Sequence, residues 1–324
     1  MERTVDWDAG VIVAIDQRAL PHEHRMLRLT SVDELVEAIR QLAIRGAPAL
    51  GAAGALGVAQ SARRHPGDEV AVRAEAARLA DARPTAVNLA WGVDRALSRL
   101  PEGPEAVLAE ALAVLDEDER VNREASRRAA DFVLRRCERR PLRVLTHCNT
   151  GRLATVAWGT ALGAVRHLAE DHQIENVLAT ESRPLLQGSR LTAYELTEAG
   201  IAYRLCPDSA AAFAMAQGMV DCVLVGADRI AANGDVANKI GTYALALAAA
   251  RHGIPFVVVA PESTVDMSLD NGRLIRIEQR AAEEVTHVAG QPVAPAGADA
   301  FNPAFDITPA DLVTAIVTES RILT

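Results

Sequence analysis

The sequence predicts a two-domain α/β protein, in which a smaller, mainly helical N-terminal domain precedes a domain built on a parallel, doubly wound sheet. Three observations lead to this fold class. The chain has 324 residues, which is near the limit of what a single hydrophobic core covers. Apolar residues recur at helical spacing up to about residue 140, whereas short β-branched runs alternate with helical stretches beyond it. We therefore expect domains at 1–140 and 141–324, with the boundary in the arginine-rich segment that ends at Pro141.

Start signals and apolar spacing define the helices expected in the first domain. Ser31 is a favoured N-cap residue, and apolar residues recur at helical spacing over 35–43. A second helix is expected to begin near Pro48, because proline is favoured in the first turn of a helix. A third helix is expected after Asn88, and one or two more over 105–136.

The second domain is expected to alternate strands and helices. The expected strands are 143–147, 176–180, 201–205, 221–226, 255–260 and 285–288. The expected helices between them are 153–168, 189–199, 210–218 and 240–252. This order predicts right-handed crossovers and a parallel sheet. Ligands bind beyond the carboxyl ends of the strands in such a sheet, so the side chains that follow each strand are the candidates for a site.

Composition excludes several classes of protein. Hydrophobic residues make up 49% and charged residues 24% of the chain, a balance typical of folded globular proteins rather than of disordered or low-complexity chains. The 34 basic and 43 acidic side chains give a net charge of −9, so we expect no broad cationic surface for nucleic acid. A local cationic pocket for one small anion is compatible with this balance.

The start of the chain and its cysteines bear on location. Met1 is followed by acidic and polar residues, and the longest uncharged stretch, 46–62, is short for a bilayer span. The four cysteines form no CxxC pair and have no histidines at zinc-finger spacing. We therefore expect a cytoplasmic protein with reduced thiols, no membrane contact and no bound metal.

Two reactive side chains follow expected strands. Cys148 comes between the first strand and a predicted helix, whose dipole would favour a thiolate; the alternative is a small buried residue. Asp228 follows the apolar run 223–226. A carboxyl group among apolar neighbours has a raised pKa and can shuttle a proton near neutral pH. The alternative for this aspartate is a turn or cap residue.

Two predicted helix starts are suited to an anion. Arg45, Gly46 and Ala47 come at the start of the second predicted helix, and Asn238 and Lys239 stand at the expected start of the helix that follows the fourth strand. Lys239 is the single lysine beside 33 arginines. An ammonium group is a compact point charge that a planar guanidinium does not imitate. The alternative is that one surface lysine has survived by chance.

Other polar residues complete the set of candidates. Arg83 opens the segment RPTAVNL, and Gln187 precedes another expected helix. His147 and His287 are lone histidines at strand ends, which we interpret as structural, and Cys222 lies within an apolar run and is expected in the core. The sequence contains no GxGxxG, Walker or HExxH motif, so we expect no nucleotide cofactor and no zinc.

Six segments together resemble the methylthioribose-1-phosphate isomerase family. They are IRGAPALG at 44–51, RPTAVNLAWG at 83–92, LTHCNTGRLATVAWGTALG at 145–163, LLQGSRLTAYEL at 185–196, VGADRIAANGDVANKIGTY at 225–243 and NPAFDITP at 302–309. The resemblance extends over nearly the whole chain, and the segments follow one another in the order of the family. The most specific of them is GADRIAANGDVANKIGT.

The resemblance implies a fold, an activity and a set of site residues. Members of the family convert 5-methylthioribose 1-phosphate to 5-methylthioribulose 1-phosphate in methionine salvage, and a helical N-terminal domain precedes their Rossmann-like domain. They are typically homodimers and use no metal or nucleotide. The catalytic cysteine and aspartate of the family fall on Cys148 and Asp228. Its substrate contacts fall on Arg45, Gly46, Ala47, Arg83, Gln187, Asn238 and Lys239.

Departures from the family pattern leave alternatives open. The chain reads TESRP at 180–184 where the family usually reads DETRP, and Leu56 stands where a tyrosine is frequent. These departures leave open a related substrate such as 5-deoxyribose 1-phosphate. Ribose-1,5-bisphosphate isomerase, of the same superfamily, shares the cysteine, the aspartate and the anion sites and is a second alternative. The regulatory subunits of translation initiation factor two-B also resemble this fold but act as binding modules. They generally lack the cysteine and aspartate pair, so its presence here favours an enzyme.

Overall fold

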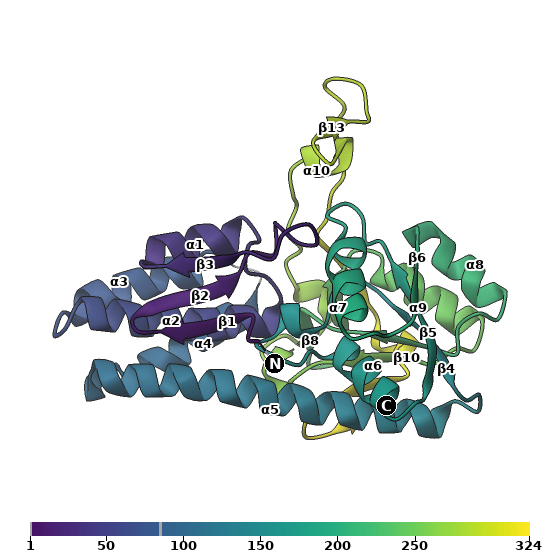
Figure 1. The fold of residues 1–324 in the computed structure, drawn as a ribbon, viewed down its shortest axis with the longest axis horizontal. Helices are drawn as coiled ribbons and strands as arrows, with labels where there is room; N and C mark the ends of the chain where they lie inside the picture. The colour runs from purple at the N-terminus through teal and green to yellow at the C-terminus, as the bar shows by residue number, and fades with distance from the viewer. Residues whose placement is uncertain (1, 84–85) are drawn as a thin grey trace.

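The computed structural model describes residues 2–83 and 86–324. A three-stranded antiparallel sheet opens the chain, with strands β1 (Val5–Asp8), β2 (Val11–Ile15) and β3 (Met26–Leu29). This sheet was not expected from the sequence. It packs against a helical layer that lies on the same side of the molecule (Figure 1).

The first two helices of the first domain agree with their predicted start signals, whereas the helix expected after Asn88 begins before it, at Val87. The helices of this domain are α1 (Val32–Arg40), α2 (Ala47–Arg64), α3 (Glu69–Ala80), α4 (Val87–Leu97) and α5 (Pro104–Arg136). Ser31 caps α1, because its hydroxyl oxygen accepts a hydrogen bond from the backbone N–H of Glu34 at 3.2 Å. Pro48 lies in the first turn of α2 as predicted. Helix α3 was not predicted from the sequence.

A seven-stranded sheet forms the second domain, in the order β16-β15-β10-β7-β4-β5-β6. Its strands are β4 (Leu142–Thr146), β5 (Ile174–Thr180), β6 (Tyr203–Cys206), β7 (Cys222–Val225), β10 (Phe256–Val259), β15 (Ala315–Val317) and β16 (Ile322–Leu323). All neighbours pair in parallel except β15 and β16. The predicted α/β class and five of the six predicted strands are confirmed.

Helices cover both faces of this sheet. They are α6 (Ala161–Glu170), α7 (Ala193–Glu198), α8 (Ala211–Ala216) and α9 (Thr242–Arg251). One core lies between the sheet and the C-terminal part of α5 with α6, and another lies between the sheet and α8 with α9. The predicted helix 153–168 was wrong at its start, because α6 begins eight residues later, after a 3-10 turn at Arg152–Ala154 and a loop.

A smaller sheet of four strands, ordered β11-β8-β9-β14, stands beside the large one. Its members are β8 (Arg229–Ala231), β9 (Val236–Lys239), β11 (Val265–Asp266) and β14 (Phe305–Thr308). Asn238 and Lys239 therefore end a strand, and the prediction that they begin a helix was wrong. The reason is pairing with β14, in which Asn238 lies opposite Asp306 and Lys239 lies opposite Phe305.

An arm projects from the second domain in Figure 1. It contains α10 (Glu283–Thr286) and the short strands β12 (His287–Val288) and β13 (Gln291–Pro292). The strand predicted at 285–288 was therefore wrong for its first half. That segment lacks a sheet neighbour in the core and pairs only within its own hairpin.

Helix α5 runs along both halves of the molecule (Figure 1). Its N-terminal part, including Val107 and Leu115, packs in the core of the first domain. Its C-terminal part, including Ala125 and Val133, packs against the large sheet. The division at residue 140 stays a prediction, since one helix belongs to both cores.

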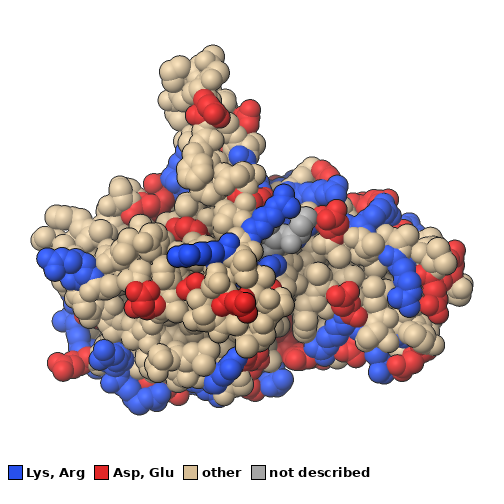
Figure 2. All heavy atoms as spheres, turned by 180° about the vertical axis from the view of Figure 1, so that it is seen from behind, with Lys and Arg blue, Asp and Glu red and all other residues tan. Residues whose placement is uncertain are grey.

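The surface and the helices of residues 2–83 and 86–324 bear on contact with a membrane or a charged partner. None of these helices is long and apolar enough to cross a membrane. Acidic and basic side chains are interspersed over the face shown in Figure 2.

Asp118 provides a test of the packing of α5. It is buried, its carboxylate accepts a hydrogen bond from the backbone N–H of Val156 at 2.7 Å, and burial raises its pKa to about 7. In the unfolded chain the Asp118 carboxyl ionises near its ordinary pKa of 3.8. The stability of the folded state should therefore decrease as the pH rises from that value to about 7. We expect Asp118→Asn, which keeps an acceptor for Val156, to raise the melting temperature at pH 8 and to change it little at pH 4. Melting curves at the two pH values check this; an equal shift at both would contradict it.

Candidate active site

One cavity brings together all nine residues selected from the sequence. They are Arg45, Gly46, Ala47, Arg83, Cys148, Gln187, Asp228, Asn238 and Lys239. The empty volume of the cavity, including space open to solvent, is about 740 Å³. The roles of the nine residues stay predictions, but their common location is a property of the fold.

Both halves of the chain supply the cavity wall. The first half contributes the start of α2 and Arg83, which follows α3. The second half contributes the segments that follow β4, β5 and β7, together with the end of β9. Since β5, β4 and β7 are neighbours in the sheet, their carboxyl ends meet at this edge, as expected for a parallel sheet.

Cys148 is held by its backbone. It lies two residues after β4 and has a φ of 61°, a left-handed conformation that costs an ordinary residue about 1 kcal/mol or more. Its N–H donates to the hydroxyl of Ser182 at 2.8 Å, and its carbonyl accepts from Thr192 at 2.6 Å. The helix-dipole argument for a thiolate was wrong, because α6 begins only at Ala161.

Asp228 presents a carboxyl group to the cavity. Its backbone N–H donates to the carbonyl of Ala237 at 2.9 Å, and no side chain among the described residues donates to its carboxylate. Burial raises the pKa of Asp228, and the positive charges of Lys239 and Arg83 partly oppose that rise. A carboxyl group with a raised pKa and free oxygens suits proton transfer to a ligand.

Lys239 faces the same space. Its ammonium group donates to the carbonyl of Ala304 at 3.0 Å and lies 4.6 Å from the ring centroid of Phe305. Burial lowers the pKa of Lys239, whereas Cys148 and Asp228 act to raise it. The ammonium therefore has a fixed position near both reactive groups.

Close backbone contact shapes the start of α2. Gly46 has a φ of 96°, and a Cβ atom at this position would lie 2.3 Å from the carbonyl oxygen of Ala154, so only glycine fits. The guanidinium of Arg45 donates to the side-chain and the backbone oxygens of Asn149, both at 2.8 Å. The helix start and its arginine are thereby attached to the loop that carries Cys148.

The side chains of the remaining predicted residues differ in their hydrogen-bond partners. Arg83 donates to Glu278 at 3.0 Å. Asn238 is buried and donates to the hydroxyl of Thr242 at 3.0 Å. Gln187 is also buried, and its amide oxygen has no partner among the residues that the structure describes. A ligand hydroxyl would satisfy that oxygen.

Sequence reasoning missed some of the wall. Asn149 and Thr150 line the cavity, and their position directly after a strand was a signal that could have selected them. Arg280 also lines the cavity but comes from the long connection before β14, where no motif marks it. The histidine interpretation holds for His147, which is buried and bonded to Thr180 and to the carbonyl of Ile240.

The charges define what the cavity can bind. Three arginines and one lysine line it, and Asp228 is the acidic residue among the described lining residues. A helix start adds backbone N–H groups. No group of three or more potential metal ligands occurs within residues 2–83 and 86–324. This arrangement suits a small anion beside a proton-transferring carboxyl group and a thiol.

Comparison with known proteins places the chain in a family. A sequence model of the Initiation factor 2 subunit family matches residues 43–324. The chain therefore belongs to the Initiation factor 2 subunit family. Among solved structures, translation initiation factor eIF-2B subunit delta from A. fulgidus shares 43% identity and a TM-score of 0.86, and the match covers 100% of this chain and 96% of that chain.

Within that family the chain is similar to methylthioribose-1-phosphate isomerases. The isomerase of Anaeromyxobacter sp. strain Fw109-5 is 53% identical over 99% of this chain and 94% of its own length. The structure of 5-methylthioribose 1-phosphate isomerase from Pyrococcus horikoshii has a TM-score of 0.90 and 40% identity, covering 100% of this chain and 92% of that chain. A probable bifunctional isomerase/dehydratase of Nocardia farcinica is 64% identical over 99% of this chain, which spans 59% of that relative.

Lys239→Arg tests whether the lone lysine is required by the geometry. The ammonium group is held by the carbonyl of Ala304 at 3.0 Å and by the ring of Phe305, whose centroid is 4.6 Å away, and a longer, planar guanidinium would displace a ligand. We expect a folded variant that loses about tenfold or more in activity at subsaturating substrate.

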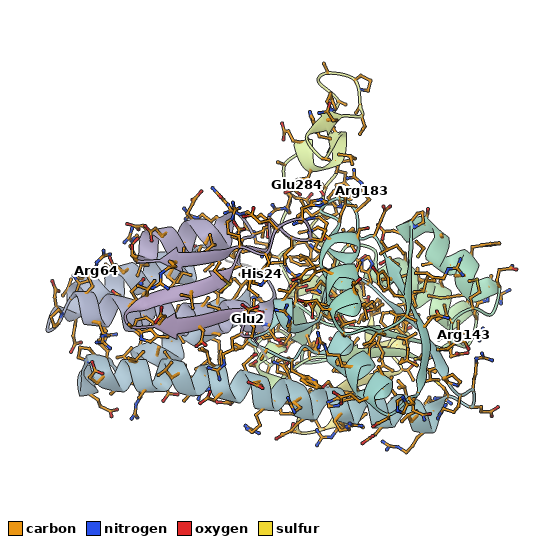
Figure 3. The ribbon with its side chains drawn as sticks, viewed as in Figure 1. Glu2, His24, Arg64, Arg143, Arg183 and Glu284 are labelled. Atoms are coloured by element: carbon orange, nitrogen blue, oxygen red, sulfur yellow. The ribbon has the colours of Figure 1, made fainter. Side chains whose placement is uncertain are left out.

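The control is Arg64→Lys, because Arg64 is exposed at the far end of α2 (Figure 3). It should keep full activity. A wild-type kcat/KM in the Lys239→Arg variant would show that the site does not require lysine at position 239.

Proposed function

We propose that the protein is an aldose–ketose isomerase that converts 5-methylthioribose 1-phosphate to 5-methylthioribulose 1-phosphate, a step of methionine salvage. The observation that carries this proposal is the meeting of Cys148 and Asp228 in one cationic cavity. Relatives named methylthioribose-1-phosphate isomerase, which match this chain over nearly its full length, support the proposal. The substrate is a small sugar phosphate, and we propose no cofactor, metal, nucleic acid or membrane partner.

The chemistry requires proton transfers at oxygen and the movement of one hydrogen. Breaking the bond between C1 and the ring oxygen places a proton on that oxygen, and forming the C2 ketone removes the proton of the C2 hydroxyl. The hydrogen of C2 ends on C1, either as a proton through an enol phosphate or as a hydride. In both routes we assign the proton transfers to Asp228, and we assign Cys148 to protonate or stabilise the developing charge.

Phosphate recognition falls to the cations. We propose that Arg45, Arg83 and Lys239, with the N–H groups at the start of α2, hold the phosphate. Such anchoring places the C1–C2 unit against Asp228 and Cys148, which is the positioning contribution to the rate. Gln187 and Asn238 would then contact sugar hydroxyls.

The remaining proposals concern domains, location and assembly. We propose that 1–140 and 141–324 are the two domains, that the protein acts in the cytoplasm, and that it forms a homodimer. The surface that supports a dimer lies on β6, α8 and α9, where Leu205, Phe213, Tyr243 and Leu247 are exposed. Helices α8 and α9 contact each other, and β6 is an edge strand.

Removing either reactive group should abolish most of the turnover. We expect Cys148→Ala and Asp228→Asn each to lower kcat by at least roughly a hundredfold, the scale of acid–base catalysis. Substrate affinity should change far less, since neither group is assigned to phosphate. An NMR assay of the purified variants measures this. Near-normal turnover in a folded variant would remove that residue from the mechanism.

The same assay separates the candidate functions when 5-methylthioribose 1-phosphate, 5-deoxyribose 1-phosphate and ribose 1,5-bisphosphate are compared side by side. We expect the first to have the highest kcat/KM. A preference for another sugar would reassign the substrate. Turnover of none of the three would favour a binding module rather than an enzyme.

Light scattering coupled to size exclusion tests the dimer. We expect the wild type at twice the 34.5 kDa chain mass and Phe213→Glu as a monomer, since a charge would be buried in the interface. Val70→Glu is the matched control, because Val70 is 80% exposed on α3, away from this surface, and should remain dimeric. A monomeric wild type would disprove the dimer.

A further inference from the structure

Glu278 lies between two arginines of the cavity wall. One carboxylate oxygen accepts from Arg83 at 3.0 Å, and the other accepts from Arg280 at 2.7 Å. Arg83 follows α3 in the first half of the chain, whereas Glu278 lies 195 residues later in the connection that leads to the arm. The ion pair therefore joins the two halves of the cavity wall.

The position of Glu278 is fixed by backbone contacts at the base of the arm. Its carbonyl accepts from the N–H of Ala304 at 2.8 Å, and the N–H of Arg280 donates to the carbonyl of Asn302 at 2.9 Å. The carbonyl of Ala304 is also the acceptor for the ammonium of Lys239. One short backbone ladder thus supports the lysine and the carboxylate.

Side chains reinforce this base. Arg280 donates to Glu284, with its closest contact at 2.5 Å, and Arg183 donates to the carbonyl of Val285 at 2.9 Å. Figure 3 shows Arg183 and Glu284 together where the arm leaves the body of the molecule. Glu278 is therefore attached to a constrained segment rather than to a free loop.

We propose that Glu278 is a positioning residue, whose carboxylate holds the guanidinium of Arg83 over the cavity so that it meets the phosphate of the substrate. This inference rests on the proposed function in one respect, the assignment of Arg83 to phosphate. Nothing in the sequence motifs pointed to Glu278.

Electrostatics gives the physical reason. Arg45, Arg83, Arg280 and Lys239 line one cavity, and like charges in a partly buried space repel one another. Glu278 is ionised there: although burial acts to raise it, the pKa of Glu278 is lowered below its ordinary value by Arg83 and Arg280. Without this carboxylate, the guanidinium of Arg83 would turn toward solvent, and ordering it again would weaken ligand binding.

A double-mutant cycle tests the proposal. Wild type, Glu278→Gln, Arg83→Ala and the double variant are compared by kcat and KM with 5-methylthioribose 1-phosphate. We expect Glu278→Gln to raise KM about tenfold with little change in kcat, and to have almost no further effect in the Arg83→Ala background. Glu278→Asp, which keeps the charge, should recover part of the affinity. Equal effects of Glu278→Gln in both backgrounds, or tighter binding in the single variant, would overturn the proposal.

A second measurement is independent of turnover. The rise in melting temperature on adding inorganic phosphate reports anion binding alone, and it should shrink in Glu278→Gln and in Arg83→Ala without shrinking further in the double variant. Glu283→Gln is the control, because Glu283 is an exposed carboxylate on the same short helix α10, and it should keep the wild-type response. A cycle that holds for phosphate in a protein without isomerase activity would reject the proposed function while leaving the role of Glu278. An undiminished phosphate response in Glu278→Gln would reject that role.

Discussion

A buried carboxylate, that of Glu195, determines the shape of the loop on which the cavity depends. Glu195 is fully buried and accepts hydrogen bonds from the backbone N–H of Arg152 at 2.8 Å and from the side chain of Asn149 at 2.9 Å. A Cβ atom at Gly151 would lie 2.2 Å from this carboxylate, so the loop closes around it only with glycine there. Because Asn149 in turn holds Arg45, the position of the arginine follows from a carboxylate on α7. Anchoring of a phosphate by Arg45 would therefore depend on a residue that never touches the ligand.

The same logic extends across the molecule. The close contact of Gly46 with Ala154 brings the start of α2 against this loop, and Asp118 on α5 holds the loop again at Val156. These contacts join the first half of the chain to the sheet edge at which Asp228 lies. The cavity is consequently a property of the interface between two cores, and a substitution in either core can displace groups in it.

The sequence predicted the parts of this architecture that follow from local rules. Alternating strands and helices gave the parallel sheet, and the sheet rule brought Cys148 and Asp228 to one edge. Prediction from the sequence failed where contacts between distant segments determine the local structure. A loop rather than the predicted helix follows Cys148, because the carboxylate of Glu195 accepts hydrogen bonds from the backbone N–H groups of Arg152 and Leu153. Lys239 ends a strand, because β14 arrives from far along the chain to pair with β9. Glu278 could not be selected, because its partner Arg83 is brought to it only by the fold.

The two titrating groups near the proposed phosphate site are linked by charge. In the empty cavity burial raises the pKa of Asp228 and lowers that of Lys239, so burial favours the neutral form of each. A bound phosphate adds negative charge to the same space, and negative charge raises the pKa of both an acid and a base. Under the proposed function, substrate binding would therefore strengthen the positive charge of Lys239 and keep Asp228 protonated to higher pH. A protonated carboxyl group is the form that can donate to the ring oxygen when the sugar opens, so the charge that anchors the substrate also prepares the acid for the first proton transfer.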